Sequence, residues 1–164
     1  MPSLDLTLNI AALGSLADCT RPGLVVPELR ERDTAGIISE LSQVLQREGC
    51  LADVLPFYQA ALNQELLSNS ALDCGIALPH ARLGGVKQLQ FALGRVPESV
   101  SWGTKGPARV QLIFLLAVPP TDAACYLQLL ASFARLGQQP ALLAELRAAG
   151  GLAAMMAVLE KVIG

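Results

Sequence analysis

The sequence predicts an α/β fold, a mixed β-sheet flanked by α-helices, and three observations lead to this prediction. Apolar residues recur at helical spacing in residues 35–45. Residues 110–118 form a continuous apolar run, which is typical of a central strand buried on both faces. The expected order is a strand, two helices, several strands and then helices, as in proteins whose helices pack on a sheet. We expect one domain over residues 1–164.

The first half of the chain is expected to contain short strands and two helices. Residues 4–13 alternate apolar and polar side chains, as in a short strand or lead-in turn, and residues 24–26 predict a buried strand. A helix is predicted to begin at Asp33 and to end at Gly49. A second helix is predicted for residues 53–67. The residues expected to face the core are Ile37, Ile38, Leu41, Val44 and Leu45 in the first helix, and Leu55, Tyr58, Ala61 and Leu62 in the second.

The second half is expected to contain further strands followed by helices. Residues 89–95 alternate like a strand, residues 100–102 predict a separate short edge segment, and the apolar run 110–118 ends at two prolines. A helix is predicted after residue 122, and two more begin near residues 140 and 152. In the first of these helices the residues expected to face inward are Leu127, Leu130, Phe133, Ala134 and Leu136.

The only histidine of the chain, His80, lies in its most informative stretch. It follows a short apolar strand at residues 76–78 and then Pro79, whose missing N–H is expected to end strand pairing. Arg82 offers a cation to any anion held beside His80. A lone histidine next to apolar residues is more often a structural, hydrogen-bonded residue, so spacing alone leaves both interpretations open.

Residues 75–82 (GIALPHAR) resemble the phosphorylation-site motif G-x-A-[IL]-P-H-[AG]-[RK] of the enzyme IIA domains of the bacterial phosphotransferase system. The resemblance is to the fructose/mannitol class, including its nitrogen-regulatory members, and it covers roughly residues 5–160 because the order of elements also agrees. It implies the fold of that class and a phosphoryl relay. In such a relay His80 accepts a phosphoryl group on Nε2 from a small phosphocarrier protein and passes it on.

The resemblance also implies roles for residues around His80. Arg82 and the backbone N–H groups near Gly84 and Gly85 would support the charge of the phosphoryl oxygens, and a backbone carbonyl would fix the imidazole tautomer. Tyr126 falls where the family has a second histidine, in a helix that reads A-x-x-H-L. A tyrosine can donate a hydrogen bond there but cannot carry a positive charge.

Two further departures from the family pattern leave a second function open. Gln64 aligns with the arginine that commonly begins the family's R-E-x-x-G-S-T-G loop, and Asp73 would oppose phosphorylation if its carboxylate pointed at the site. The chain is therefore either a phosphohistidine carrier or regulatory domain, or a degenerate IIA-like module that binds a partner without being phosphorylated. The nitrogen-regulatory branch suits a free-standing chain of this length better than a transporter subunit does.

The cysteines raise a third alternative. Cys74 and Cys125 belong to segments expected to meet near His80, where they could form a reversible disulfide or contribute to a zinc site. The chain's four cysteines are widely spaced and show no C-x-x-C pattern, which favours reduced thiols. We expect both cysteines to be small buried hydrophobic residues, with no cofactor and no metal.

Composition limits the expected partners and location. A net charge of −2 without a basic cluster argues against nucleic acid, and the apolar run 112–120 is too short to span a membrane. A start without a basic segment favours the cytoplasm. The expected partners are the phosphocarrier protein and a downstream regulatory or transporter protein, and 16% charged residues would also allow a homo-oligomer. We expect Ala81 and Leu83 to rim the histidine, with Trp102 in the core.

Overall fold

The computed structural model describes residues 14–103, 108–121 and 123–163, and the short strand or lead-in turn expected at residues 4–13 lies outside them. Its centre is a five-stranded sheet in the order β1-β4-β5-β2, with β3 also paired to β5. The strands are β1 (Val25–Val26), β2 (Ile76–Ala77), β3 (His80–Arg82), β4 (Gln90–Ser101) and β5 (Arg109–Val118). The helices are α2 (Thr34–Arg47), α3 (Val54–Leu67), α4 (Ala123–Gly137), α5 (Pro140–Ala148) and α6 (Leu152–Glu160), preceded by the 3₁₀ turns η1 (Leu16–Cys19) and η2 (Pro22–Leu24).

The sheet is mixed, as predicted, and β5 lies at its centre. β4 is antiparallel to β5, whereas β1 runs parallel to β4 and both β2 and β3 run parallel to β5. The expectation of a separate edge segment at residues 100–102 is wrong, because β4 continues to Ser101 with a shift in register between Arg95 and Val100. Pro97 lies within that irregular stretch, and it has no N–H to donate to a ladder.

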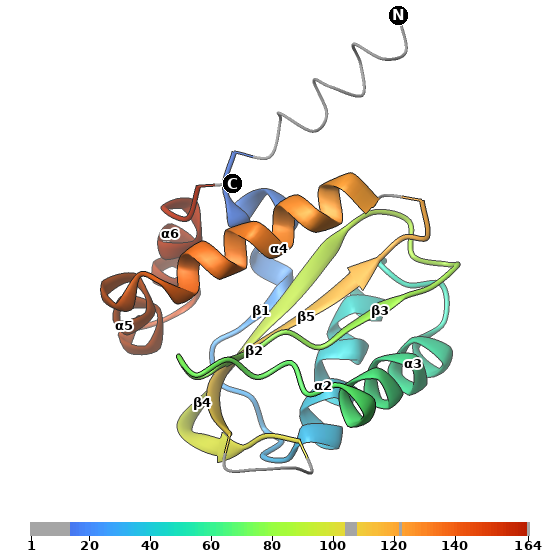
Figure 1. Cartoon of the computed structure of the whole chain (residues 1–164), viewed down its shortest axis with the longest axis horizontal. Helices are drawn as coiled ribbons and strands as arrows, with labels where there is room; N and C mark the ends of the chain where they lie inside the picture. Colours follow the sequence, from blue (N-terminus) through green and yellow to red (C-terminus); the bar gives the residue numbers. More distant parts are fainter. Residues whose placement is uncertain (1–13, 104–107, 122, 164) are drawn as a thin grey trace, which may run out of the picture.

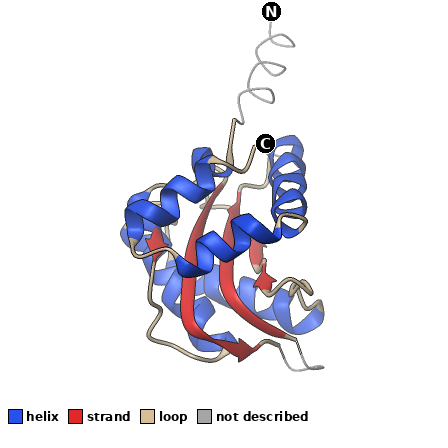
Figure 2. Cartoon of the chain, turned by 90° about the vertical axis from the view of Figure 1, so that its left-hand side faces the viewer, coloured by secondary structure: helices blue, strands red, loops and turns tan. Residues whose placement is uncertain are grey.

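Helices cover both faces of the sheet (Figure 1), as the view turned by 90° also shows (Figure 2). Alternate residues of β5 enter two different cores, because successive side chains of a strand point to opposite faces. Ile113, Leu115 and Ala117 pack with α2 and α3. Leu112, Phe114, Leu116 and Val118 pack with α4, α5 and α6. We call these two sides the α2/α3 face and the α4 face.

Helix α2 agrees with its prediction. The side chain of Asp33 caps it by accepting the N–H of Gly36 at 2.6 Å, and Gly49 adopts a φ of 80° just beyond its end. All five residues expected to face the core are buried. One clear apolar stripe on an otherwise polar helix leaves only one orientation that buries it.

The predicted core faces of α3 and α4 are partly wrong. In α3, Leu55 is 57% exposed, while Phe57, Ala61 and Glu65 are buried. In α4, Leu127 is 65% exposed and Ala134 is also exposed, while the buried residues are Leu129, Ser132, Phe133 and Leu136. Both helices are apolar over most of their surface, so the spacing of apolar residues does not determine which side faces the sheet.

The described parts of the chain contain no helix that combines the length and the apolar character needed to cross a bilayer.

Candidate functional site

His80 begins β3 on the edge of the sheet, directly after Pro79. The expectation that Pro79 ends strand pairing is only partly right. β2 ends at Ala77, before Pro79, but the Pro79 carbonyl accepts the N–H of Leu116 at 2.9 Å, and His80 is again paired with Leu116 in the parallel register. Proline lacks a donor but keeps its acceptor, and on an edge strand the donor can face away from the sheet. Pro79 therefore separates β2 from β3 and still holds His80 against β5.

The register of β3 sets the direction of its three side chains. His80 and Arg82 lie opposite Leu116 and Val118, which pack on the α4 face, and Ala81 between them joins the core of the α2/α3 face. His80 and Arg82 therefore share the α4 face. Ala81 is only 3% exposed, so its expected place on the rim is wrong. Leu83 also packs on the α2/α3 face, while Trp102, 1% exposed, lies in the core as expected.

The imidazole of His80 is half-buried and contacts the backbone just before it. Its Nδ1 lies 3.4 Å from the carbonyl oxygen of Leu78. A carbonyl oxygen can only accept, so this contact favours the proton on Nδ1, which in the neutral imidazole leaves the lone pair on Nε2. Leu78 thus supplies the backbone carbonyl that was expected to fix the tautomer.

Tyr126, in the first turn of α4, lies against the imidazole. The two ring centroids are 5.9 Å apart and the rings are tilted by 44°. Burial raises the pKa of the Tyr126 hydroxyl above its ordinary value, and the positive charge of Arg82 opposes that rise to a smaller degree. The hydroxyl is therefore a neutral hydrogen-bond donor at neutral pH.

Arg82 completes this group of three residues, which we call the His80 site. Its side chain is exposed and makes no hydrogen bond or ion pair with any residue that the structure describes. The guanidinium therefore remains available for an anion held beside the imidazole. β3 supplies His80 and Arg82, α4 supplies Tyr126, and the three predicted site residues come together.

Cys74 and Asp73 lie away from this group, and the two cysteines lie far from each other. Cys74 packs beside Gly137 at the end of α4, whereas Cys125 lies twelve residues earlier on the same helix, about 18 Å away along its axis. A disulfide or shared metal between them is therefore excluded by distance. Asp73 is exposed and precedes β2, whose pairing with β5 begins about 13 Å along the strand from His80. Its carboxylate does not approach the imidazole.

The Gly84–Gly85 turn belongs to the other side of the sheet. The carbonyl of Gly85 accepts the N–H of Ala52 before α3, and Val86 enters the core of the α2/α3 face. Gln64 is exposed on α3. The expected backbone support from this turn is therefore not seen at His80, whereas Arg82 and Tyr126 do share its face.

Two polar residues near the site were missed by the sequence analysis. Glu65 is 3% exposed, and its carboxylate accepts both the N–H and the hydroxyl of Ser70. The hydroxyl of Ser70 in turn accepts the N–H of Leu78, the residue whose carbonyl contacts His80. Two signals pointed to them: Glu65 has helical spacing after Phe57 and Ala61, and Glu65 and Ser70 fall on the E and the T of the R-E-x-x-G-S-T-G pattern that Gln64 begins.

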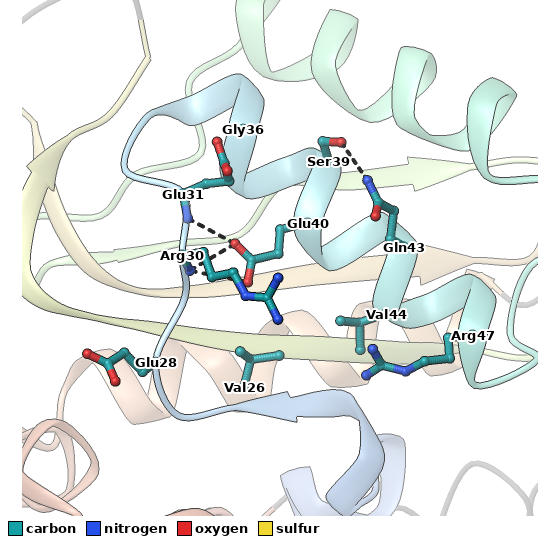
Figure 3. A pocket seen from close by; sticks show the side chains of 10 residues that line it. All are labelled: Val26, Glu28, Arg30, Glu31, Gly36, Ser39, Glu40, Gln43, Val44 and Arg47. Atoms are coloured by element: carbon teal, nitrogen blue, oxygen red, sulfur yellow. Dashed lines mark hydrogen bonds between the residues drawn. The ribbon is translucent and has the colours of Figure 1, made fainter.

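A charged hollow elsewhere on the molecule is separate from the His80 site. It has a volume of about 520 Å³ and lies between α2 and the segment that follows β1. Figure 3 shows the Glu40 carboxylate directed at the N–H groups of Arg30 and Glu31, 3.0 Å from each. Glu40 thus fixes the backbone of that segment. The described residues contain no group of three or more histidine, cysteine or acidic side chains arranged to hold a metal ion.

Comparison with protein families gives one match along most of the chain. The family described as "Phosphoenolpyruvate-dependent sugar phosphotransferase system, EIIA 2" matches residues 19–162. A nitrogen regulatory protein of Bradyrhizobium diazoefficiens is 26% identical over 149 residues, which are 88% of this chain and 94% of that protein. A 2-O-alpha-mannosyl-D-glycerate-specific EIIABC component of Escherichia coli is 36% identical over 87 residues, 52% of this chain. Those residues are only 13% of the EIIABC component, so the match covers a small part of it.

Solved structures share the fold. The crystal structure of nitrogen regulatory protein IIA-Ntr from Neisseria meningitidis has a TM-score of 0.77 at 27% identity. The matched region covers 88% of this chain and 98% of the Neisseria chain. The Escherichia coli complex of enzyme IIAMTL with phosphorylated enzyme IIBMTL gives a TM-score of 0.71 at 16% identity. The matched region covers 84% of this chain and 94% of the chain in that complex. The second likeness establishes the fold alone. Both agree with the predicted mixed sheet flanked by helices, which is confirmed.

Proposed function

Because the chain belongs to the phosphoenolpyruvate-dependent sugar phosphotransferase system EIIA 2 family, we propose that it accepts and passes on a phosphoryl group at Nε2 of His80. Family membership was predicted from residues 75–82, and the match over residues 19–162 confirms it. The observation that carries the proposal is the contact between Nδ1 of His80 and the carbonyl of Leu78. It leaves the nucleophilic lone pair on Nε2, beside Arg82 and Tyr126.

The proposed transfer uses the three residues of the His80 site in different ways. The Nε2 lone pair forms a bond to phosphorus on the side opposite the donor. The bond between the donor and phosphorus breaks, and the donor atom keeps its electron pair. Nδ1 retains its proton, and the Leu78 carbonyl stabilises the positive charge that develops on the ring. Arg82 neutralises charge on the phosphoryl oxygens, and the Tyr126 hydroxyl donates a hydrogen bond to one of them. No cofactor or metal has a role in this scheme.

The proposed donor is the phosphocarrier protein of the relay, acting in the cytoplasm. A donor protein must bring its phosphoryl group close to Nε2, so the surface around His80 must accept a protein. Leu127 supports this, because it follows Tyr126 on α4 and is a large apolar side chain that is 65% exposed. The proposed acceptor is a regulatory or transporter protein. The higher identity and TM-score of the Neisseria IIA-Ntr structure favour a regulatory role.

Incubation with phosphoenolpyruvate, the first enzyme of the relay and the phosphocarrier protein tests the proposal. Intact-mass spectrometry should show a gain of one phosphoryl group that is labile in acid and stable in base, as a phosphohistidine is. The Escherichia coli mannitol IIA domain in the same mixture serves as the positive control. If that control is phosphorylated and this chain is not, the chain is a degenerate module that binds a partner without accepting phosphate.

Arg82 variants should change the rate of transfer without changing stability. Arg82→Lys keeps the charge but loses the planar two-pronged donor, so the rate should fall about threefold, and Arg82→Ala should lower it about tenfold or more. Quenched-flow mass spectrometry measures these rates. The matched control is Lys87→Ala, which removes another exposed cation beyond β3 and should leave the rate unchanged. Equal rates for wild type and both Arg82 variants would show that Arg82 does not contact the phosphoryl group.

The Tyr126 hydroxyl should contribute separately from its ring. Tyr126→Phe keeps the packing against the imidazole and removes only the donor, so transfer should slow about threefold to tenfold. Since burial raises the pKa of this hydroxyl, the donor is present throughout neutral pH and is lost only when the pH rises beyond the ordinary range of tyrosine. The rate ratio of wild type to Tyr126→Phe should therefore be constant from about pH 6 to pH 9. A ratio of one would remove Tyr126 from the mechanism.

A further inference from the structure

The geometry points to Glu65 and Ser70 as positioning residues for His80. They hold the backbone of Leu78 so that its carbonyl selects the Nδ1–H tautomer of the imidazole. The effect on phosphoryl transfer rests on the proposed function, whereas the effect on the tautomer does not. Their hydrogen bonds go to each other and to the backbone of Leu78, so both act through the main chain.

Glu65 binds Ser70 by both of its carboxylate oxygens. Oε2 accepts the Ser70 N–H at 2.6 Å, and Oε1 accepts the Ser70 hydroxyl at 2.5 Å. Glu65 is 3% exposed, and a buried carboxylate is costly unless it is hydrogen-bonded, so these two bonds are needed to keep it there. Ser70 is therefore fixed in both its backbone and its side-chain direction by a rigid helix, α3.

Ser70 in turn fixes Leu78. The Ser70 hydroxyl donates its hydrogen bond to Glu65, so its oxygen is available to accept the Leu78 N–H, at 3.0 Å. The chain between them folds back on itself through an antiparallel bridge from Ala71 to Ala77 and a hydrogen bond of 2.8 Å from the Leu72 N–H to the Ile76 carbonyl. The hydrogen bond between Ser70 and Leu78 thus joins the two ends of the segment 70–78 just before His80.

Leu78 is constrained from both directions. Its N–H is held by Ser70, and the following Pro79 is held to β5 through its carbonyl and restricts Leu78 to an extended backbone. The Leu78 carbonyl then lies 3.4 Å from Nδ1, close to the upper limit for a hydrogen bond. A small displacement of Leu78 would break this contact, so the tautomer depends on how firmly Leu78 is held.

Four variants separate positioning from simple stabilisation of the loop. Ser70→Ala removes the acceptor for the Leu78 N–H, and Ser70→Thr restores a hydroxyl at the same place. Glu65→Gln removes the charge and alters the two hydrogen bonds to Ser70, while Ser70 itself is left in place. Ser68→Ala is the matched control, since Ser68 lies in the same loop, is exposed, and its hydroxyl bonds to none of the described residues.

The first readout is ¹⁵N NMR of the unphosphorylated imidazole, at a pH above the ordinary titration range of histidine. His80 is the only histidine, so its two ring nitrogens are observed without overlap. Wild type, Ser70→Thr and Ser68→Ala should show the proton on Nδ1. In Ser70→Ala and Glu65→Gln the ratio of Nδ1–H to Nε2–H should fall about threefold to tenfold. A ratio unchanged in both variants would overturn the proposal, whatever their stability.

The second readout is the rate of phosphoryl transfer. Ser70→Ala should slow transfer about tenfold, and Ser70→Thr should restore it, because small displacements of a reacting atom are costly. A changed tautomer ratio with an unchanged rate would overturn the link between positioning and transfer. If wild type accepts no phosphoryl group, the proposed function fails, and the NMR readout still decides whether Glu65 and Ser70 position His80.

Discussion

Replacement of His80 by alanine should abolish phosphoryl acceptance completely. The chain has no other histidine, and the neighbouring site residues, Arg82 and Tyr126, are not substitutes for an imidazole nitrogen of neutral charge. Incubation with the full relay should give the mass gain in wild type and none in His80→Ala. A gain that persists in His80→Ala would place the phosphoryl group on another residue.

This loss should not come from unfolding. His80 is half-buried on an edge strand, and the interactions of its side chain with the described residues are a long contact to Leu78 and a ring contact to Tyr126. We expect the free energy of unfolding of His80→Ala to fall by no more than about 1 kcal/mol. Urea denaturation followed by circular dichroism measures it. His80→Gln, which keeps a polar side chain of similar length, should be folded and equally inactive.

Arg95→Ala should cause a large loss of stability. From β4, the Nε of Arg95 donates to the carbonyl of Pro27 at 3.0 Å, after β1. Its Nη1 lies within 3.2 Å of the carbonyl oxygens of Leu146, Arg147 and Ala149 at the end of α5. The last carbonyls of a helix have no partner within the helix, and a cation there also interacts favourably with the helix dipole. One side chain thus joins β1, β4 and α5.

Its removal should lower the free energy of unfolding by about 2–3 kcal/mol, because a charged donor and several carbonyls lose their partners. Arg95→Lys should recover only part of this, since one ammonium cannot reach both groups of carbonyls. Arg30→Ala is the matched control, because the exposed Arg30 side chain bonds to no described residue, and it should change stability by less than about 0.5 kcal/mol. A loss in Arg95→Ala no larger than in this control would contradict the assignment.

The sequence predicted the elements whose patterns admit one arrangement. The stripe from Ile37 to Leu45 has a polar opposite side, and the apolar run of β5 suits only a strand covered on both faces. It failed for the orientation of α3 and α4, where Leu55 and Leu127 are exposed, because these helices are apolar on several sides. Which side of α3 or α4 faces the sheet depends on tertiary packing, and the local sequence pattern does not encode it.

The residues of the His80 site could be predicted from the sequence, but the hydrogen bonds that support them could not. The motif around His80 and the place of Tyr126 in the family pattern identified residues that the fold then brings together. The support from Glu65 through Ser70 to Leu78 was not predictable, because it joins side chains to backbone groups across a turn. The places of Cys74 and Cys125 at opposite ends of α4 likewise required the three-dimensional structure.

The central claim, that Nε2 of His80 is the atom that accepts the phosphoryl group, can be tested on the phosphorylated protein itself. With ¹⁵N in its only histidine, NMR resolves which ring nitrogen is bonded to phosphorus. The contact to the Leu78 carbonyl predicts phosphorus–nitrogen coupling at Nε2 and a proton retained on Nδ1. Coupling at Nδ1, or phosphorylated protein with no coupling at either nitrogen, would contradict it.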